Sequence, residues 1–171
     1  RLDLTATDSD GVTSGLVSSN SFETRLGRLR LEDSYGPETS DLEIRLFADY
    51  YDGTNWVVNS ADSCSTYISG DATLDNTSYT EQLSNGETNI FAPIVQQTTN
   101  SGISDLNNGL WYTAPGVNNY GSVKVDFDIS SLPWMAFDWD TDNTIDDPSA
   151  RLYFGYYRGS DRVIYWKEVR N

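Results

Sequence analysis

The sequence of 171 residues has no histidine, one cysteine and one methionine. Without histidine the chain lacks the usual general base near neutral pH and the commonest ligand of transition metals. A Ser-His-Asp triad is therefore excluded. Cys64 has no second cysteine in this sequence to pair with, so it is either a buried free thiol or the partner of a cysteine elsewhere.

Basic residues and long apolar runs are also scarce. Eleven lysines and arginines face 26 aspartates and glutamates, which gives a formal net charge of −15. We expect no nucleic-acid partner, because such a partner requires a basic surface that displaces counterions. No apolar run reaches the roughly 18 residues of a membrane-spanning helix, so we expect no direct membrane insertion. The start, Arg1-Leu-Asp-Leu4, lacks the features of a signal peptide and predicts that the sequence was taken from a longer chain.

The pattern that is present is alternation of apolar and polar residues, which is typical of half-buried strands. It predicts strands at 2–4, 29–31, 42–51, 56–58, 77–83, 88–95, 110–112, 123–129, 152–156 and 162–169. About seven to ten short strands at this spacing predict an all-β fold, an antiparallel β-sandwich or a jelly-roll-like domain. Residues 1–21 are rich in Ser, Thr, Asp and Gly and are interpreted as a linker or the end of a preceding module, and 22–171 as a single domain.

Two dipeptides predict hairpins. Asp52-Gly53 precedes the strand at 56–58, and Asn85-Gly86 stands between the expected strands at 77–83 and 88–95. Both dipeptides favour the tight turns that join antiparallel strands. The polar stretch Gln96 to Asn108 is instead expected to be a long surface loop.

The most informative chemistry lies between Phe137 and Pro148, where aspartates alternate with other residues. Counted from Asp138, oxygen ligands fall at the first, third, fifth, seventh and ninth positions, which is the spacing of a calcium loop. Position 12 is Ser149, so Asp147 or a distant residue such as Glu168 has to complete the shell. We expect one Ca²⁺ with ligands drawn from Asp138, Asp140, Asp142, Thr144, Asp146 and Asp147. The alternative is a solvated acidic turn whose aspartates cap backbone N–H groups.

Aromatic residues are plentiful, with five tryptophans and eleven tyrosines. Amphipathic rings of this kind are common at recognition surfaces and can stack on sugars. The candidate ligand-binding residues are Tyr51, Trp56, Trp111, Trp139 and Tyr157. The alternative is packing, because aromatic residues are favoured in strands in any case. A carboxylate pair for glycoside hydrolysis also stays open, although no distinctive motif marks one.

Several short sequence motifs, taken in order, resemble those of a known family. They are Gly27-Arg-Leu-Arg-Leu-Glu-Asp-Ser-Tyr-Gly36, Tyr51-Asp-Gly53, Asp62-Ser-Cys64, Gly109-Leu-Trp111, Ala114-Pro-Gly116, Leu132-Pro-Trp134, Phe137-Asp-Trp-Asp140, Asp147-Pro-Ser-Ala-Arg151, Phe154-Gly-Tyr-Tyr-Arg-Gly159 and Arg162-Val-Ile-Tyr-Trp-Lys-Glu168. From about Phe22 to the end, the chain resembles the C-terminal region of the MshQ family, which is encoded with the mannose-sensitive haemagglutinin (MSHA) type IV pilus. In that family the acidic loop usually reads Asp-Trp-Asp-Gly-Asp-Gly, whereas Thr141 and Asn143 stand at the glycines here.

The resemblance implies a secreted, pilus-associated bacterial surface protein, a tip adhesin or an assembly factor, and it carries over no catalytic residues. We therefore expect a non-enzymatic extracellular domain with a calcium-stabilised loop, whose partners are other pilus components or cell-surface glycans. Two alternatives stay open. One is a calcium-dependent, lectin-like carbohydrate-binding module. The other is an assembly module that docks onto minor pilins through a strand edge or an aromatic patch.

Overall fold

The computed structural model describes residues 3–4, 9–10, 17–18, 25–91, 96–104 and 109–156. It confirms the expected all-β class, because strands dominate and the only helical elements are three short 3₁₀ turns within the described ranges: η1 (Ser69–Asp71), η2 (Ile129–Ser131) and η3 (Pro133–Met135). None of the helical elements in these ranges is long and apolar enough to cross a membrane.

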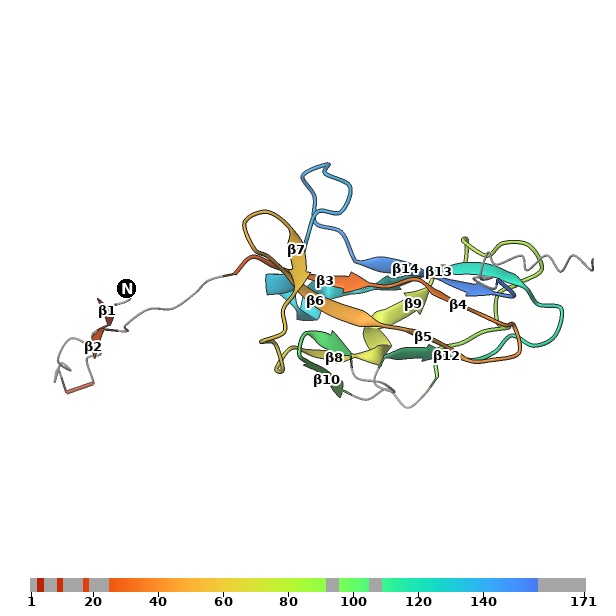
Figure 1. Ribbon diagram of the computed structural model, residues 1–171, viewed down its shortest axis with the longest axis horizontal. Helices are drawn as coiled ribbons and strands as arrows, with labels where there is room; N and C mark the ends of the chain where they lie inside the picture. Colours follow the sequence, from red (N-terminus) through yellow and green to blue (C-terminus); the bar gives the residue numbers. More distant parts are fainter. Residues whose placement is uncertain are drawn as a thin grey trace, which may run out of the picture.

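Two main sheets and a two-stranded sheet make up the sandwich (Figure 1). The first main sheet has the order β3 (Gly27–Leu31), β6 (Leu46–Tyr51), β11 (Ile103–Ser104), β10 (Gln96–Asn100) and β8 (Thr66–Ile68), with β7 (Trp56–Val58) also paired to β6. The second has the order β4 (Ser34–Gly36), β14 (Ser149–Phe154), β13 (Gly121–Phe127) and β9 (Ala72–Leu74). β5 (Leu42–Ile44) pairs with β12 (Leu110–Tyr112). A separate pair, β1 (Asp3–Leu4) and β2 (Val17–Ser18), lies near the N-terminus.

The hydrophobic core lies between the sheets. Leu29 and Leu31 point into it from β3, and Val123, Val125 and Phe127 point into it from β13. The alternation that predicts these strands also gives each one a buried face, and fully burying one such side chain contributes about 1.5–3 kcal/mol.

The predicted strand at 42–51 is divided, and the one predicted at 29–31 is closely followed by a further strand, because the chain changes sheets at both places. β3 belongs to the first main sheet, but after Glu32 and Asp33 the chain continues as β4, parallel to β14 in the second. Arg45 separates β5 from β6 in the same way, and its carbonyl accepts the Glu32 amide at 3.0 Å. The described residues between Gly27 and Phe154 contain twelve strands, where about seven to ten were expected.

The hairpin at Asp52-Gly53 is confirmed, because β6 pairs antiparallel with β7 and Tyr51 lies opposite Trp56. The hairpin at Asn85-Gly86 is wrong in its first strand, and residues 92–95 of its second lie outside the described ranges. A turn does form, with the Glu87 amide donating to the Ser84 carbonyl, but residues 75–83 are turns that hydrogen-bond alongside β13 instead of forming a strand.

The expected surface loop at 96–108 was also wrong where it is described. β10 and β11 form a hairpin around Ser101 and Gly102, which both have positive φ angles, 53° and 78°. The alternation of apolar and polar residues does not predict these two strands, because their buried positions carry hydroxyl side chains. The Thr99 hydroxyl donates to Asp62, and the Ser104 hydroxyl accepts the Leu46 amide at 3.1 Å. Residues 105–108 lie outside the described ranges, as does the strand expected at 162–169.

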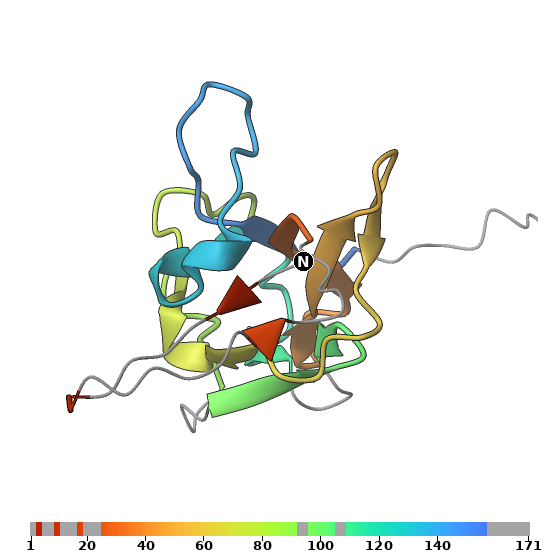
Figure 2. The ribbon, with the colours of Figure 1, turned by 90° about the vertical axis from the view of Figure 1, so that its left-hand side faces the viewer.

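The connection from β13 to β14 carries the acidic loop, and it projects from the same side of the domain as the β6–β7 hairpin in both views (Figures 1 and 2). η2 and η3 fill the first part of this connection, and the Asp128 side chain caps η2 by accepting the Ser130 amide. The fold thus places the acidic loop and the hairpin tip on one face.

Candidate metal and ligand site

The acidic loop is closed at its base by its own backbone. Phe137 and Asp146 form an isolated antiparallel bridge, with the Asp146 amide donating to the Phe137 carbonyl at 3.1 Å. The Trp139 amide then donates to Asp146 Oδ2 at 2.9 Å. Residues 138–145 consequently form a compact loop on a fixed neck.

Three carboxylates converge inside this loop. Asp138, Asp140 and Asp146 each offer an oxygen, and these oxygens lie within 4.8 Å of one another. The donor set is hard oxygen only, which suits Ca²⁺ because that ion takes six to eight oxygen ligands in flexible geometry. The donor atoms of these three residues therefore fit a calcium ion.

The same carboxylates also cap the loop backbone. Asp138 accepts the amides of Thr141 and Asn143 at 2.6 and 2.8 Å, and Asp140 accepts the Asp142 amide at 3.1 Å. These hydrogen bonds are those expected of an acidic capped turn. Capping and metal binding are compatible, because an ionised carboxylate has about four lone-pair sites.

Two of the predicted carboxylate ligands, Asp142 and Asp147, lie outside the convergent group. Asp142 accepts the backbone amide of Thr144 at 2.8 Å as well as its hydroxyl, and these bonds, led by the hydroxyl, lower the pKa of Asp142. Asp147 turns away and accepts the Ile129 amide at 3.0 Å. The structure thus brings Asp138, Asp140 and Asp146 together, and it gives Asp142 and Asp147 other hydrogen-bond partners. Thr144 lies beside Asp142, to which its amide and hydroxyl donate.

Two loop residues adopt the left-handed conformation. Thr141 has a φ of 66° and Asn143 a φ of 72°. Asparagine tolerates this region, but a β-branched residue such as threonine rarely does. Thr141 and Asn143 stand where the resemblance to the MshQ family implies glycine, and the positive φ angles at both positions favour glycine.

An arginine from β3 links the loop to the β6–β7 hairpin. The Arg28 guanidinium lies 4.3 Å from the ring centre of Trp56, 5.2 Å from that of Phe137 and 4.7 Å from that of Trp139. The rings also contact one another edge to face, at 5.0 Å between Trp56 and Phe137 and 5.2 Å between Phe137 and Trp139. Cation–π attraction and ring packing therefore hold the neck of the loop against the hairpin.

Asp49 anchors this arginine from below. Its buried carboxylate lies 3.5 Å from Arg28 Nε and 2.9 Å from Arg30 Nε. Burial lowers the pKa of Arg28 and Asp49 opposes that effect, but an arginine stays charged throughout the ordinary pH range. Neither Arg28 nor Asp49 was expected at this site, because the register that pairs β3 with β6 is not visible in the sequence.

The predicted aromatic residues do not form one surface. Tyr51, Trp56 and Trp139 belong to the cluster around Arg28, with Tyr51 5.7 Å from Trp56. Trp111 lies on β12, in the separate two-stranded sheet. Tyr157 lies outside the described residues. Because Arg28 lies over both Trp56 and Trp139, one face of each ring is already occupied.

An open cavity of about 660 Å³ lies beside the loop. It is lined by Arg30, Leu31, Lys124, Asp126, Trp139, Asp140, Asp146, Asp147 and Ser149. Both cations in the lining are paired, Arg30 with Asp49 and Lys124 with Asp126 at 2.6 Å. Asp140, Asp146 and Asp147 therefore leave the cavity acidic, with Trp139 in its wall.

Cys64 is exposed, which corrects the expectation that a free thiol here is buried. Its Sγ lies 3.5 Å from Asp62 Oδ1, and this negative neighbour raises the pKa of the thiol. Asp62 is the buried member of the pair and accepts the Ser65 amide and the Thr99 hydroxyl.

Comparison with known families gives one match. The family model for the fourth domain of DUF6701 matches residues 25–169 of this chain. The chain belongs to the DUF6701 family. No curated protein and no solved structure matches it. The DUF6701 domain spans both the sandwich and the acidic loop, so the site described above lies wholly inside it.

Proposed function

We propose that this DUF6701 domain is a non-enzymatic, extracellular module of a pilus-associated bacterial surface protein, and that one Ca²⁺ stabilises its acidic loop. The observation that carries the calcium part is the convergence of Asp138, Asp140 and Asp146 within 4.8 Å. The proposed association with a pilus is supported by the series of sequence motifs that resemble those of the MshQ family, from Gly27-Arg-Leu-Arg-Leu31 to Arg162-Val-Ile-Tyr-Trp166.

Calcium in this loop has a clear structural role. Uncompensated, three carboxylates at this spacing repel one another, and a divalent cation removes that repulsion. The neck of the loop packs on Trp56 and Arg28, so an ordered loop also supports the hairpin. The bound ion would stabilise the folded state by mass action, by about 2.7 kcal/mol at one hundred times the dissociation constant.

Thermal melting in chelator and in millimolar Ca²⁺ tests the metal. We expect calcium to raise the melting temperature by several degrees, and equal concentrations of Mg²⁺ to raise it less, because Mg²⁺ demands tight octahedral geometry. Equal melting temperatures in chelator and calcium would reject the proposed ion.

Two matched variants locate the site. Asp146→Asn removes a member of the convergent group, whereas Asp142→Asn changes a carboxylate of the same loop that turns to Thr144. We expect the first substitution to abolish the calcium-dependent shift and the second to retain most of it. Equal loss in both variants would show that Asp142 is needed for calcium binding as much as Asp146 is, and would contradict the assigned group.

A second candidate function is calcium-dependent glycan binding. The specific observation in its favour is that Trp139, Asp140 and Asp146 line one open cavity. An aromatic ring beside a cation and its carboxylates can stack on a sugar and bind its hydroxyls. Docking onto other pilus components is the remaining alternative, and it does not require the loop.

A further inference from the structure

The chain contains two Asn-Gly dipeptides, Asn85-Gly86 and Asn108-Gly109. In such a dipeptide the backbone nitrogen of the glycine can attack the side-chain amide of the asparagine, because glycine has no side chain to block the approach. Asparagine is accordingly one of the thermolabile residues of proteins. A hydrogen bond that holds the attacking nitrogen slows this reaction, so the fold decides which of the two dipeptides reacts.

Asn85-Gly86 stands open to solvent. Both residues are exposed, in a turn that is closed by the Glu87 amide donating to the Ser84 carbonyl at 3.2 Å. Apart from its chain neighbours, no atom lies within 4 Å of the position that a Cβ on Gly86 would take. Burial and Glu87 raise the pKa of Tyr79 and the Gly86 amide opposes them, so this amide lies near the Tyr79 hydroxyl, but no hydrogen bond of good geometry joins the two. The Gly86 nitrogen therefore remains available for the attack.

At the second dipeptide the attacking nitrogen is held. The buried Gly109 amide donates to Glu43 Oε1 at 2.9 Å, and a Cβ on Gly109 would collide with the Glu43 side chain. This contact is fixed by the pairing of β12 with β5, which sets Leu110 opposite Ile44. Asn108 lies outside the described ranges. The Gly109 nitrogen is thus already bonded to a side chain of the neighbouring strand.

The Asp52-Gly53 turn offers a comparison, because an aspartate closes the same ring only when its carboxyl group is protonated. The Asp52 side chain accepts the amides of Asn55 and Thr54 at 2.7 and 2.8 Å, and these bonds lower the pKa of Asp52. Its carboxylate therefore stays ionised near neutral pH and does not react. Of the two turn dipeptides, only Asn85-Gly86 keeps a reactive side chain.

The segments on either side of the Asn85 turn are anchored to different sheets. Before the turn, the Gln82 amide donates to the Tyr120 carbonyl at 3.0 Å, directly before β13. After it, the buried Thr88 hydroxyl donates to the Thr113 carbonyl at 2.7 Å, directly after β12. The turn therefore links the second main sheet to the two-stranded sheet.

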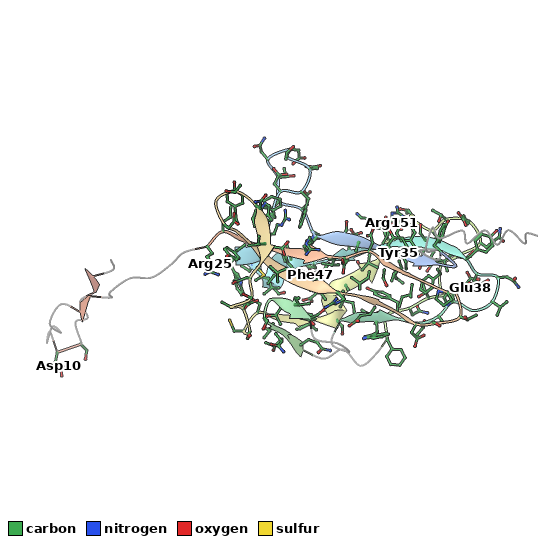
Figure 3. The ribbon with its side chains drawn as sticks, in the orientation of Figure 1. Asp10, Arg25, Tyr35, Glu38, Phe47 and Arg151 are labelled. Atoms are coloured by element: carbon green, nitrogen blue, oxygen red, sulfur yellow. The ribbon has the colours of Figure 1, made fainter. Side chains whose placement is uncertain are left out.

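This turn lies at the other end of the domain from the acidic loop. Tyr120 neighbours Glu38, since a Cβ on Gly155 would meet both, 2.6 Å from Tyr120 Cβ and 3.4 Å from Glu38 Oε2. Figure 3 labels Glu38 at one end of the domain and Arg25 at the other, and the acidic loop projects from the half nearer Arg25 (Figures 1 and 3). Chemistry at Asn85 is thus independent of the proposed calcium site.

We propose that Asn85 is a site of spontaneous deamidation. The Gly86 nitrogen bonds to the side-chain carbonyl carbon of Asn85, and the bond from that carbon to the amide nitrogen breaks. The proton lost from Gly86 is balanced by one that water delivers to the leaving group, which departs as ammonia and leaves a succinimide ring. Water then opens the ring at either carbonyl carbon. The product is an aspartate, which adds a negative charge to the turn, or an isoaspartate, which lengthens its backbone by an atom.

Ageing of the folded, unmodified chain in mildly alkaline water enriched in heavy oxygen tests the site. Peptide mass spectrometry gives the extent of conversion at each asparagine, and a heavy oxygen in the product marks opening of the ring by water. We expect Asn85 to convert several-fold faster than Asn108 in the folded chain. In concentrated urea the two should convert at similar rates, because the hydrogen bond from Gly109 to Glu43 is lost. A folded chain in which Asn85 does not convert, or in which it is no faster than Asn108, would overturn the proposal.

Two variants add a control and a second readout. Asn85→Gln keeps a side-chain amide but closes the larger ring far more slowly, so conversion at this position should stop while Asn108 is unchanged. Glu43→Ala frees the Gly109 amide and should speed the conversion of Asn108 several-fold, whereas Asn85 should keep its rate. Circular dichroism reports whether each variant is folded. An Asn108 rate that stays the same in folded Glu43→Ala would show that the amide hydrogen bond does not set the rates, and would contradict the selection of Asn85 by the fold.

Discussion

The guanidinium of Arg28 lies 4.7 Å from the ring centre of Trp139, so a residue of β3 is held against the neck of a loop that follows it by more than a hundred positions. The contact joins the first main sheet to the acidic loop across the face of the sandwich. Since Asp49 fixes Arg28 from below, the arginine supports the loop from a rigid base. The loop geometry therefore depends on residues outside the loop.

Replacement of Arg28 by methionine, which keeps an unbranched side chain without the charge, should lower the free energy of unfolding by about 1–2 kcal/mol, because the cation–π contacts with Trp56, Phe137 and Trp139 are lost. Urea unfolding measures this change. A double-mutant cycle with Trp139→Leu should show a coupling of about 0.5 kcal/mol or more. Arg25→Met, which removes a cation from the Tyr50 ring, is the control and should not couple to Trp139. Additive effects of Arg28→Met and Trp139→Leu would refute the link.

Thr141→Gly should stabilise the loop, because Thr141 has a φ of 66° and glycine adopts this region without a steric cost. The relief of about 1–2 kcal/mol is partly offset by the greater freedom of glycine in the unfolded chain. We expect a small rise in melting temperature and tighter calcium binding, measured by titration calorimetry. Thr144→Gly, outside the positive-φ positions, is the control and should weaken the loop. A lower calcium affinity in Thr141→Gly would show that the threonine conformation is not strained.

For the glycan candidate, Trp139→Ala should weaken calcium-dependent binding roughly tenfold or more, because its ring lines the acidic cavity. Trp111→Ala should leave binding unchanged, since Trp111 lies in the separate two-stranded sheet. A broad glycan array, read with calcium and with chelator, supplies the ligand and the measurement. An array without signal under both conditions would eliminate the lectin-like function, and equal loss in both variants would indicate general destabilisation.

The buried carboxylate of Asp62 should make part of the stability depend on pH. Burial works to raise the pKa of Asp62, but hydrogen bonds from Thr99, Ser65 and Cys64 outweigh it and leave the pKa below its usual value. Because the folded-state pKa is the lower one, this contribution is complete above the unfolded pKa of about 3.9 and is lost as the pH falls through the folded value.

Thr99→Val isolates this effect. It removes the hydroxyl that donates to Asp62 Oδ2 at 2.8 Å. A hydrogen bond to a charged group contributes about 1.5–3 kcal/mol, so the variant should be less stable by roughly this amount at pH 6 and by less at pH 3. Urea unfolding at both values gives the comparison, and Thr73→Val, at an exposed position of β9, is the control. A difference between Thr99→Val and the unmodified chain that grows towards pH 3 would contradict the assignment.

Sequence alone determined the class of the fold and the place of the acidic loop. Alternation in Val123, Val125 and Phe127 is a local property, since a period of two puts every second side chain on one face. The turn at Asp52-Gly53 is equally local. The convergent carboxylates of Asp138, Asp140 and Asp146 lie within nine residues, so their spacing already predicted a shared site.

Only the tertiary structure decided which side chains support that loop and which strands exist around it. Arg28 meets Trp139, and Asp49 meets Arg28, through a register between distant strands, and no local pattern encodes such a register. The β10–β11 hairpin could not be predicted from the sequence for a related reason. Its buried positions are hydroxyls satisfied by partners far along the chain, and a polar residue is predicted to be exposed until its hydrogen-bond partner is known.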